Sequence, residues 1–198
     1  EVAMYILENH PEEAKIETSF SYALFYCAAS SPKADDDRMI QLLYMKKTPL
    51  LPNHDSNLCP IQKAIKLKNI PILKGLLKIY RPKNVNEGCD ILTPLMTSIS
   101  YGLVSGVDLL LEAGENPLFV TPDGRCALSH ACLINHKVDG KDSSFEIIQK
   151  LLNAIGNHNI EPFEKYKSGP IQWICQSKSP QIARLIFDFH PEVDVNRV

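Results

Sequence analysis

Three residues in one short stretch carry side chains that can bind a metal ion: His130, Cys132 and His136. A structural zinc site needs four such ligands, usually supplied as closely spaced pairs. Cys132 and His136 are four residues apart and would share a helix face, whereas His130 would point elsewhere. No CxxC or HxxxH pair completes the set. The pattern predicts a buried cysteine beside a surface histidine, and neither a metal ion nor another cofactor.

Catalytic motifs are missing from the sequence too. It contains no nucleophile elbow, no phosphate-cradling glycine loop and no metalloprotease helix. Gly102 and Gly106 do not have the spacing of a dinucleotide-binding loop, and Trp173 is more typical of a core or a concave surface than of a cofactor stack. We therefore expect a protein that is not an enzyme.

Positive charge is concentrated between Lys46 and Lys83, where nine Lys or Arg residues accompany one acid, Asp55. One interpretation is a docking patch for an acidic segment of a partner or for a phosphate. The other, which is commoner, is a solvated face whose long side chains cover apolar surface. The net charge is −2, and nucleic-acid binding would need more positive charge with interleaved aromatic residues, so none is expected.

The clearest secondary-structure signal is a first helix that opens at Thr93-Pro94. Proline suits the first helical turn because its missing N–H would have no partner there. Apolar residues recur once per turn at Leu95, Ile99 and Leu103, which predicts one buried face.

A second helix is expected next, after a break bracketed by Gly102 and Gly106. Its apolar run is Val107 to Leu111, and it ends at Gly114, a natural left-handed cap. Neither helix is long enough to be stable alone. The pair therefore needs neighbours that cover its apolar sides.

Copies of this helix pair recur along the chain. The first three begin at Cys59, Thr93 and Cys126, separated by 34 and 33 residues, and a fourth begins at Gly169. Each leads to a Leu-Leu or Leu-Ile pair in its second helix. A period of about 33 residues with a Thr-Pro-Leu opening resembles the ankyrin repeat. The third copy also has that family's turn before the helix, Asp123-Gly124-Arg125-Cys126.

The resemblance implies an all-α fold, an α-solenoid of stacked helix-turn-helix repeats joined by hairpin-like loops. We expect a single array over residues 1–198, cut from a longer protein. Its parts are a partial repeat at 1–15 and repeats near 16–49, 50–83, 84–117, 118–158 and 159–198. The family's Thr-Pro-Leu-His tetrapeptide is never complete, because its fourth position is Gln62, Met96, Ser129 or Gln172. The hydrogen bonds of that histidine must be replaced or lost.

Two modules carry about eight extra residues between their helices, at 30–37 and at 136–143. The second insertion contains Asp139-Gly140, a turn signal. Inserted loops that recur on one side of an array often mark a working face.

Cysteine usage and hydropathy indicate a cytoplasmic protein, or a nuclear one. Four of the six cysteines, at 59, 126, 132 and 175, fall at small-residue helix positions of the repeat, which predicts reduced and buried thiols. No apolar run approaches the roughly 18–20 residues of a membrane span, and the N-terminal residues are not a signal peptide.

The family resemblance implies protein–protein interaction through the concave helix face and the finger-like loops. Matching the repeat pattern to this sequence selects twelve partner-binding candidates: Phe25, Tyr26, Lys63, Lys66, Leu67, Tyr101, Leu133 and Ile134 on the helices, and Phe119, Arg125, Phe163 and Tyr166 on the loops. Exposed apolar residues at such positions favour a partner that covers them. The alternative is that rotated modules pack them against the insertions. Two other functions stay open, a self-associating scaffold segment and a regulatory array attached to an enzyme domain outside this chain.

Overall fold

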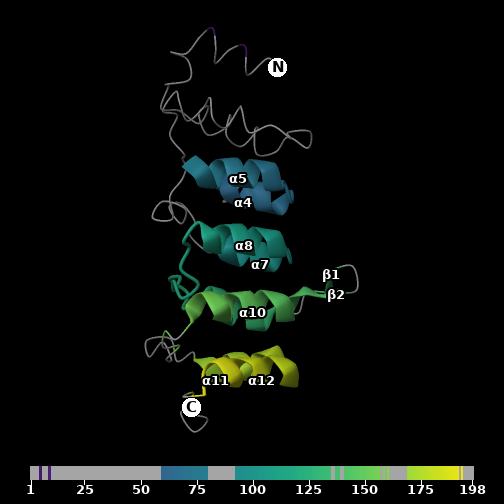
Figure 1. Cartoon of the computed structure of the whole chain (residues 1–198), viewed down its shortest axis with the longest axis vertical. Coiled ribbons are helices and arrows are strands. Elements are labelled where there is room, and N and C mark those ends of the chain that lie inside the picture. The colour runs from purple at the N-terminus through teal and green to yellow at the C-terminus, as the bar shows by residue number, and fades with distance from the viewer. Residues whose placement is uncertain are drawn as a thin grey trace. The chain divides into compact units, whose positions relative to one another are not determined.

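The computed structural model describes residues 5, 9, 59–79, 92–134, 137–138, 141–156, 158, 160, 169–191 and 193. The chain divides into two compact units, Glu1–Asp90 and Ile91–Val198. Within its described residues it forms eight helices and one pair of two-residue strands (Figure 1). The expectation of an all-α fold is confirmed. None of the described helices has the length and apolar character needed to cross a membrane.

In the first unit, the described helices are α4, Pro60–Lys66, and α5, Ile70–Ile79, which pack against each other. Pro71 lies in the first turn of α5. The Asn69 side chain accepts a hydrogen bond from the Ile72 N–H at 3.2 Å and so caps that turn. Six apolar residues of these two helices are fully buried: Ile61, Ala64, Ile65, Ile72, Leu73 and Leu76.

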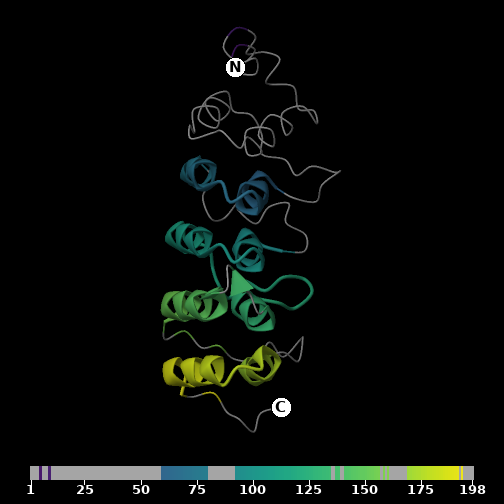
Figure 2. The same ribbon diagram turned by 90° about the vertical axis from the view of Figure 1, so that its right-hand side faces the viewer.

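The second unit contains three helix pairs. They are α7, Pro94–Ser100, with α8, Val104–Glu112; α9, Ala127–Leu133, with α10, Ser143–Ile155; and α11, Pro170–Ser177, with α12, Pro180–Phe189. The first helices α7, α9 and α11 contact one another in chain order, and so do the second helices α8, α10 and α12. Figure 2 shows these as two rows. The core lies between the rows and includes Leu95, Leu110, Leu128, Ile148, Leu151, Trp173 and Ile186.

Helices α4, α7 and α8 end with the same pair of backbone hydrogen bonds around a residue in the left-handed conformation. After α8, Gly114 has φ +89°, and the N–H groups of Gly114 and Glu115 bond back to the carbonyls of Leu111 and Leu110. This Schellman pattern satisfies carbonyls that the helix leaves open, and it confirms Gly114 as the predicted cap. The equivalent residues are Gly102 after α7 and Lys68 after α4.

The predicted break between α7 and α8 is shorter than expected. Gly102 is in the turn, but Gly106 lies inside α8, so that part of the prediction is wrong. Leu103 likewise is not on α7, because it is the N-terminal cap of α8. Glycine is required at 106 for another reason. An added Cβ atom would lie 2.9 Å from both the Ser98 Oγ and the Leu103 Cδ2, so the glycine lets α8 approach α7 closely.

Gly106→Ala should therefore destabilise the protein by about 1 kcal/mol, because Ser98 and Leu103 must shift in a packed core. On an exposed helix the same change would stabilise by a similar amount. The Ser98 hydroxyl is buried and has no hydrogen-bond partner, so Ser98→Ala should reduce the cost of the alanine at 106. Urea denaturation of both single variants and the double variant measures this coupling. Ser105→Ala, exposed on α8, is the control, and additive single effects would contradict the contact.

The insertion between α9 and α10 contains a strand pair that the sequence did not predict. Strands β1, Lys137–Val138, and β2, Lys141–Asp142, are antiparallel, with Lys137 opposite Asp142. The Ser144 hydroxyl donates to the Ile134 carbonyl at 3.1 Å and ties the base of the insertion together. Asp139-Gly140 and the insertion at 30–37 lie outside the described residues.

The cysteine prediction is confirmed at three positions and wrong at the fourth. Cys59, Cys126 and Cys132 are buried, whereas Cys175 is exposed, and all four are free thiols. Cys175 lies on α11 two residues after Trp173, which is 1% exposed and fills the core. Because the large indole takes the buried side of α11, the side chain at 175 faces solvent.

Candidate protein-binding surface

Three of the first helices, α4, α9 and α11, begin with the same kind of hydrogen bond. The Gln62 Oε1 accepts from the Cys59 N–H at 3.0 Å, and the Gln172 Oε1 accepts from the Gly169 N–H at 3.0 Å. In α9 the Ser129 Oγ accepts from the Cys126 N–H at 2.9 Å. The fourth residue of each motif thus satisfies an N–H that the helix start leaves open.

Helix α7 is the exception, because Met96 stands at the fourth position. There the Thr93 Oγ1 accepts from the Met96 N–H, and the Glu115 Oε1 accepts from the Leu95 N–H, both at 3.2 Å. Glu115 is 5% exposed, and its Oε2 has no hydrogen-bond partner. Burial raises the pKa of the Glu115 carboxyl to about 7, partly offset by hydrogen bonds from the Leu95 N–H and from Thr93. The segment after α8 is therefore tied to the start of α7 through a buried carboxyl group.

The finger loop that leads from α8 to α9 has a defined tip. The Gly124 N–H bonds to the Thr121 carbonyl at 2.8 Å, and the Thr121 N–H bonds to the Arg125 carbonyl at 2.9 Å. Asp123 accepts hydrogen bonds from the Thr121 hydroxyl and from the Arg125 guanidinium, with which it also forms an ion pair. Gly124 has φ +83°, as expected for a hairpin of this length. The loop presents Phe119 with its side chain exposed.

Two exposed apolar side chains lie at the C-terminal ends of adjacent first helices. Tyr101 caps α7 and is 36% exposed, and Leu133 ends α9 and is 45% exposed. The Ser100 Oγ and the buried His130 Nε2 are 2.8 Å apart, and this hydrogen bond joins α7 to α9. Ile134, the cap of α9, is half-buried. We call Tyr101, Leu133 and Ile134 the first-helix patch.

In the first unit, three predicted residues lie together on the last turn of α4. Leu67 caps the helix, as Tyr101 caps α7, and it is 45% exposed. Lys66 is exposed and Lys63 is half-buried. Here an apolar side chain is surrounded by positive charge, whereas no charged residue belongs to the first-helix patch.

Four other predicted partner-binding residues lie outside the described part of the chain: Phe25, Tyr26, Phe163 and Tyr166. The patterns that selected them stay predictions. Cys132 is buried, as expected, while His136 also lies outside the described residues. Among the residues that the structure describes, no group of three His, Cys, Asp or Glu side chains is placed to hold a metal ion.

Phe145 on α10 is an exposed aromatic residue that the sequence analysis missed. It is 37% exposed and lines a shallow depression between α10 and α12. The buried residues of α10 form a stripe at helical spacing: Ser143, Ser144, Ile147, Ile148, Leu151, Leu152 and Ile155. Phe145 falls off that stripe, which is a signal that the sequence did contain.

Comparison with known protein families found no matching family model, and comparison with curated proteins found no match.

Proposed function

We propose that this chain is an ankyrin-type α-solenoid that binds a protein partner and has no catalytic activity. Two observations in the second unit support the solenoid: the first helices form one row and the second helices another, and each helix packs against the other helix of its pair and against the equivalent helix of the adjacent pair. The repeated capping bonds at the starts of α4, α9 and α11 and the repeated Schellman ends also favour identical modules.

The binding role depends on the first-helix patch. A tyrosine and a leucine exposed on neighbouring helices form an apolar surface that is costly to leave in water and that a partner can cover. Aromatic residues at such positions tend to dominate binding energy. The Ser100–His130 hydrogen bond and the finger-loop bonds hold the surface in one arrangement, so little entropy is lost when a partner binds.

The partner we propose differs between the two units. The three residues of the first-helix patch are uncharged, and they suit an apolar segment that carries at least one large side chain. The end of α4, with Lys63, Lys66 and Leu67, suits an acidic segment that also has an apolar residue. The proposal also includes a cytoplasmic location and no binding of nucleic acid.

Selection of displayed random peptides on the whole chain tests the role of the patch. Peptides enriched on the unmodified chain should lose about tenfold or more in affinity for Tyr101→Ala and still more for Tyr101→Ala/Leu133→Ala, because both anchors are removed. Melting temperatures should change little, since both side chains are exposed. Phe145→Ala is the control, an exposed aromatic on the other row. Equal affinity for all variants would overturn the patch, and a large drop in melting temperature would show that Tyr101 is a core residue.

A further inference from the structure

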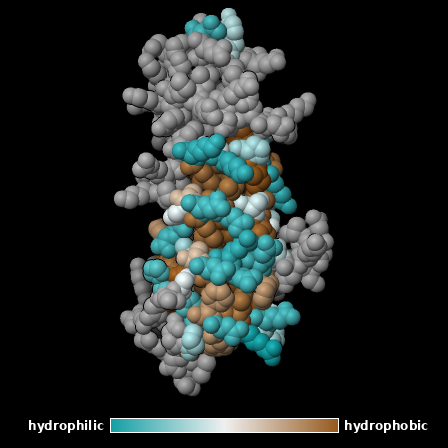
Figure 3. Space-filling model, viewed as in Figure 1, coloured by the Kyte–Doolittle hydropathy of each residue, from teal (hydrophilic) through white to brown (hydrophobic). Residues whose placement is uncertain are grey.

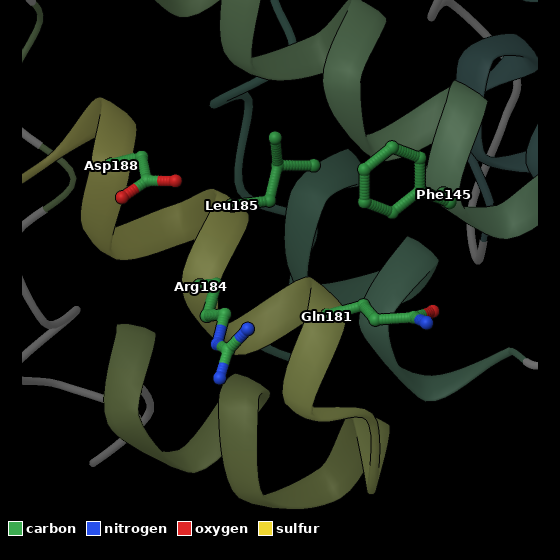
Figure 4. Close-up of a pocket in the computed structure, with 5 residues that line it drawn as sticks. All are labelled: Phe145, Gln181, Arg184, Leu185 and Asp188. Carbon is green, nitrogen blue, oxygen red and sulfur yellow. The ribbon is translucent and has the colours of Figure 1, made fainter.

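The second-helix row has a shallow depression of about 440 Å³ between α10 and α12, lined by Phe145, Gln181, Arg184, Leu185 and Asp188. Figure 4 shows Leu185 extending from α12 toward the side where the Phe145 ring lies, with the charged side chains of the same helix around it. In Figure 3, which views this row, hydrophobic residues lie between hydrophilic ones. Phe145 is 37% exposed whereas Leu185 is only 9% exposed, so Phe145 supplies most of the apolar surface beside the exposed Arg184 and Asp188.

The charged side chains of this depression have no ion-pair partner among the residues that the structure describes. Arg184 and Asp188 are exposed and lie one turn apart on α12, yet they form no ion pair with each other or with another described residue. Lys150 in the same row behaves differently, because its Nζ lies 2.8 Å from Asp108 and 3.8 Å from Glu146. An arginine that precedes an aspartate by four residues is the weaker orientation for a pair within one helix. Because neither charge is paired within the described part of the chain, both can pair with a binding partner.

We propose that this face binds the same face of a second copy of the chain. With the two α12 helices antiparallel about a two-fold axis, Arg184 of each copy meets Asp188 of the other, and the exposed Phe145 side chains lie beside these pairs. A surface that carries one charge of each sign beside an apolar side chain is complementary to itself. A purely acidic or purely basic partner would meet one like charge. The dimer uses the second-helix row, so the first-helix patch stays open in both copies.

Sedimentation equilibrium of the 198-residue chain tests the dimer and its charge pairing. We expect a monomer–dimer equilibrium that weakens at high salt. Arg184→Asp gives two acidic residues and Asp188→Arg gives two basic ones, so each single variant should weaken its own dimer at least about tenfold. The double variant, Arg184→Asp/Asp188→Arg, should dimerise again because the pairs are only exchanged.

Mixing the two single variants tests the charge pairing most directly. Each acidic face then meets a basic face, so a mixed dimer should form that neither variant forms alone. Lys74→Asp, a similar charge change at an exposed position of α5, is the control and should leave the dimer unchanged. Circular dichroism confirms that each variant is folded. A chain that stays monomeric at all concentrations, a dimer indifferent to both single changes, or a mixture that does not associate would each overturn the proposal.

Discussion

Glu115→Gln is expected to make the stability of the protein much less dependent on pH between 4.5 and 7, the ordinary and the native pKa of this carboxyl group. At pH 8 the variant should be more stable than the unmodified protein by about 3 kcal/mol, the free energy of a pKa shift of that size. At pH 4.5 and below, the two proteins should have nearly the same stability. Urea denaturation at a series of pH values measures the difference.

The sign follows from which form of the carboxyl group the fold favours. The native pKa of Glu115 is raised above the unfolded value, mainly by burial, so the native state binds a proton more tightly than the unfolded state does. Its contribution is fully present below the unfolded pKa and is lost as pH rises through the native pKa. Glutamine is always neutral, and its oxygen can still accept from the Leu95 N–H. The variant therefore keeps the capping bond without the ionisation.

Glu112→Gln is the matched control. Glu112 is an exposed glutamate at the end of α8, three residues before Glu115. It should give the same pH profile as the unmodified protein. A profile for Glu115→Gln that runs parallel to that of the unmodified protein would show that the carboxyl group at 115 ionises freely in the native state.

The helices could be predicted from the sequence because short amphipathic helices have a periodic pattern of apolar residues. Pro94 and Pro180 are the first residues of α7 and α12, and Gly114 is the left-handed cap that was expected. These features are local, since each depends on the backbone preference of one residue. The same pattern also predicted that the fold is all-α, with helices packed in chain order.

Contacts between residues far apart could not be predicted in this way. The capping of α7 by Glu115 joins residues 20 apart, and the role of Gly106 depends on the Ser98 side chain of another helix. Cys175 was placed inside because its position in the repeat is usually small, but Trp173 already occupies the buried side of α11. Whether such a residue is buried depends on how it packs against a particular neighbour. The preference of a single residue type does not show this packing.

The binding candidates were selected by their position in the repeat. For those candidates that the structure describes, it shows how far each side chain is exposed. Tyr101, Leu133 and Phe119 are exposed, whereas Ile134 is half-buried. Exposure follows from helical register, which periodicity fixes to within one residue. Whether a partner covers these side chains depends on another molecule, and the sequence of this chain does not describe it.

Leu110→Ala should cost about 2 to 5 kcal/mol of the free energy of unfolding, the second large effect that we expect. Leu110 is fully buried in α8, 0% exposed, and the chain packs around it on both sides, since α8 contacts α7 and α10. Truncation removes the transfer energy of the side chain and leaves a cavity that the two neighbouring helices can fill only in part. Urea denaturation measures the loss.

Leu111→Ala provides the comparison, because it makes the same chemical change one position along. The Leu111 side chain is half-buried, so its truncation should cost roughly 1 kcal/mol. A helix turns about 100° per residue, and a register shifted by one residue would therefore exchange the two costs. A nearly neutral Leu110→Ala beside a costly Leu111→Ala would place a different face of α8 toward α7 and α10, and the assignment of buried and exposed residues in the neighbouring pairs would have to change with it.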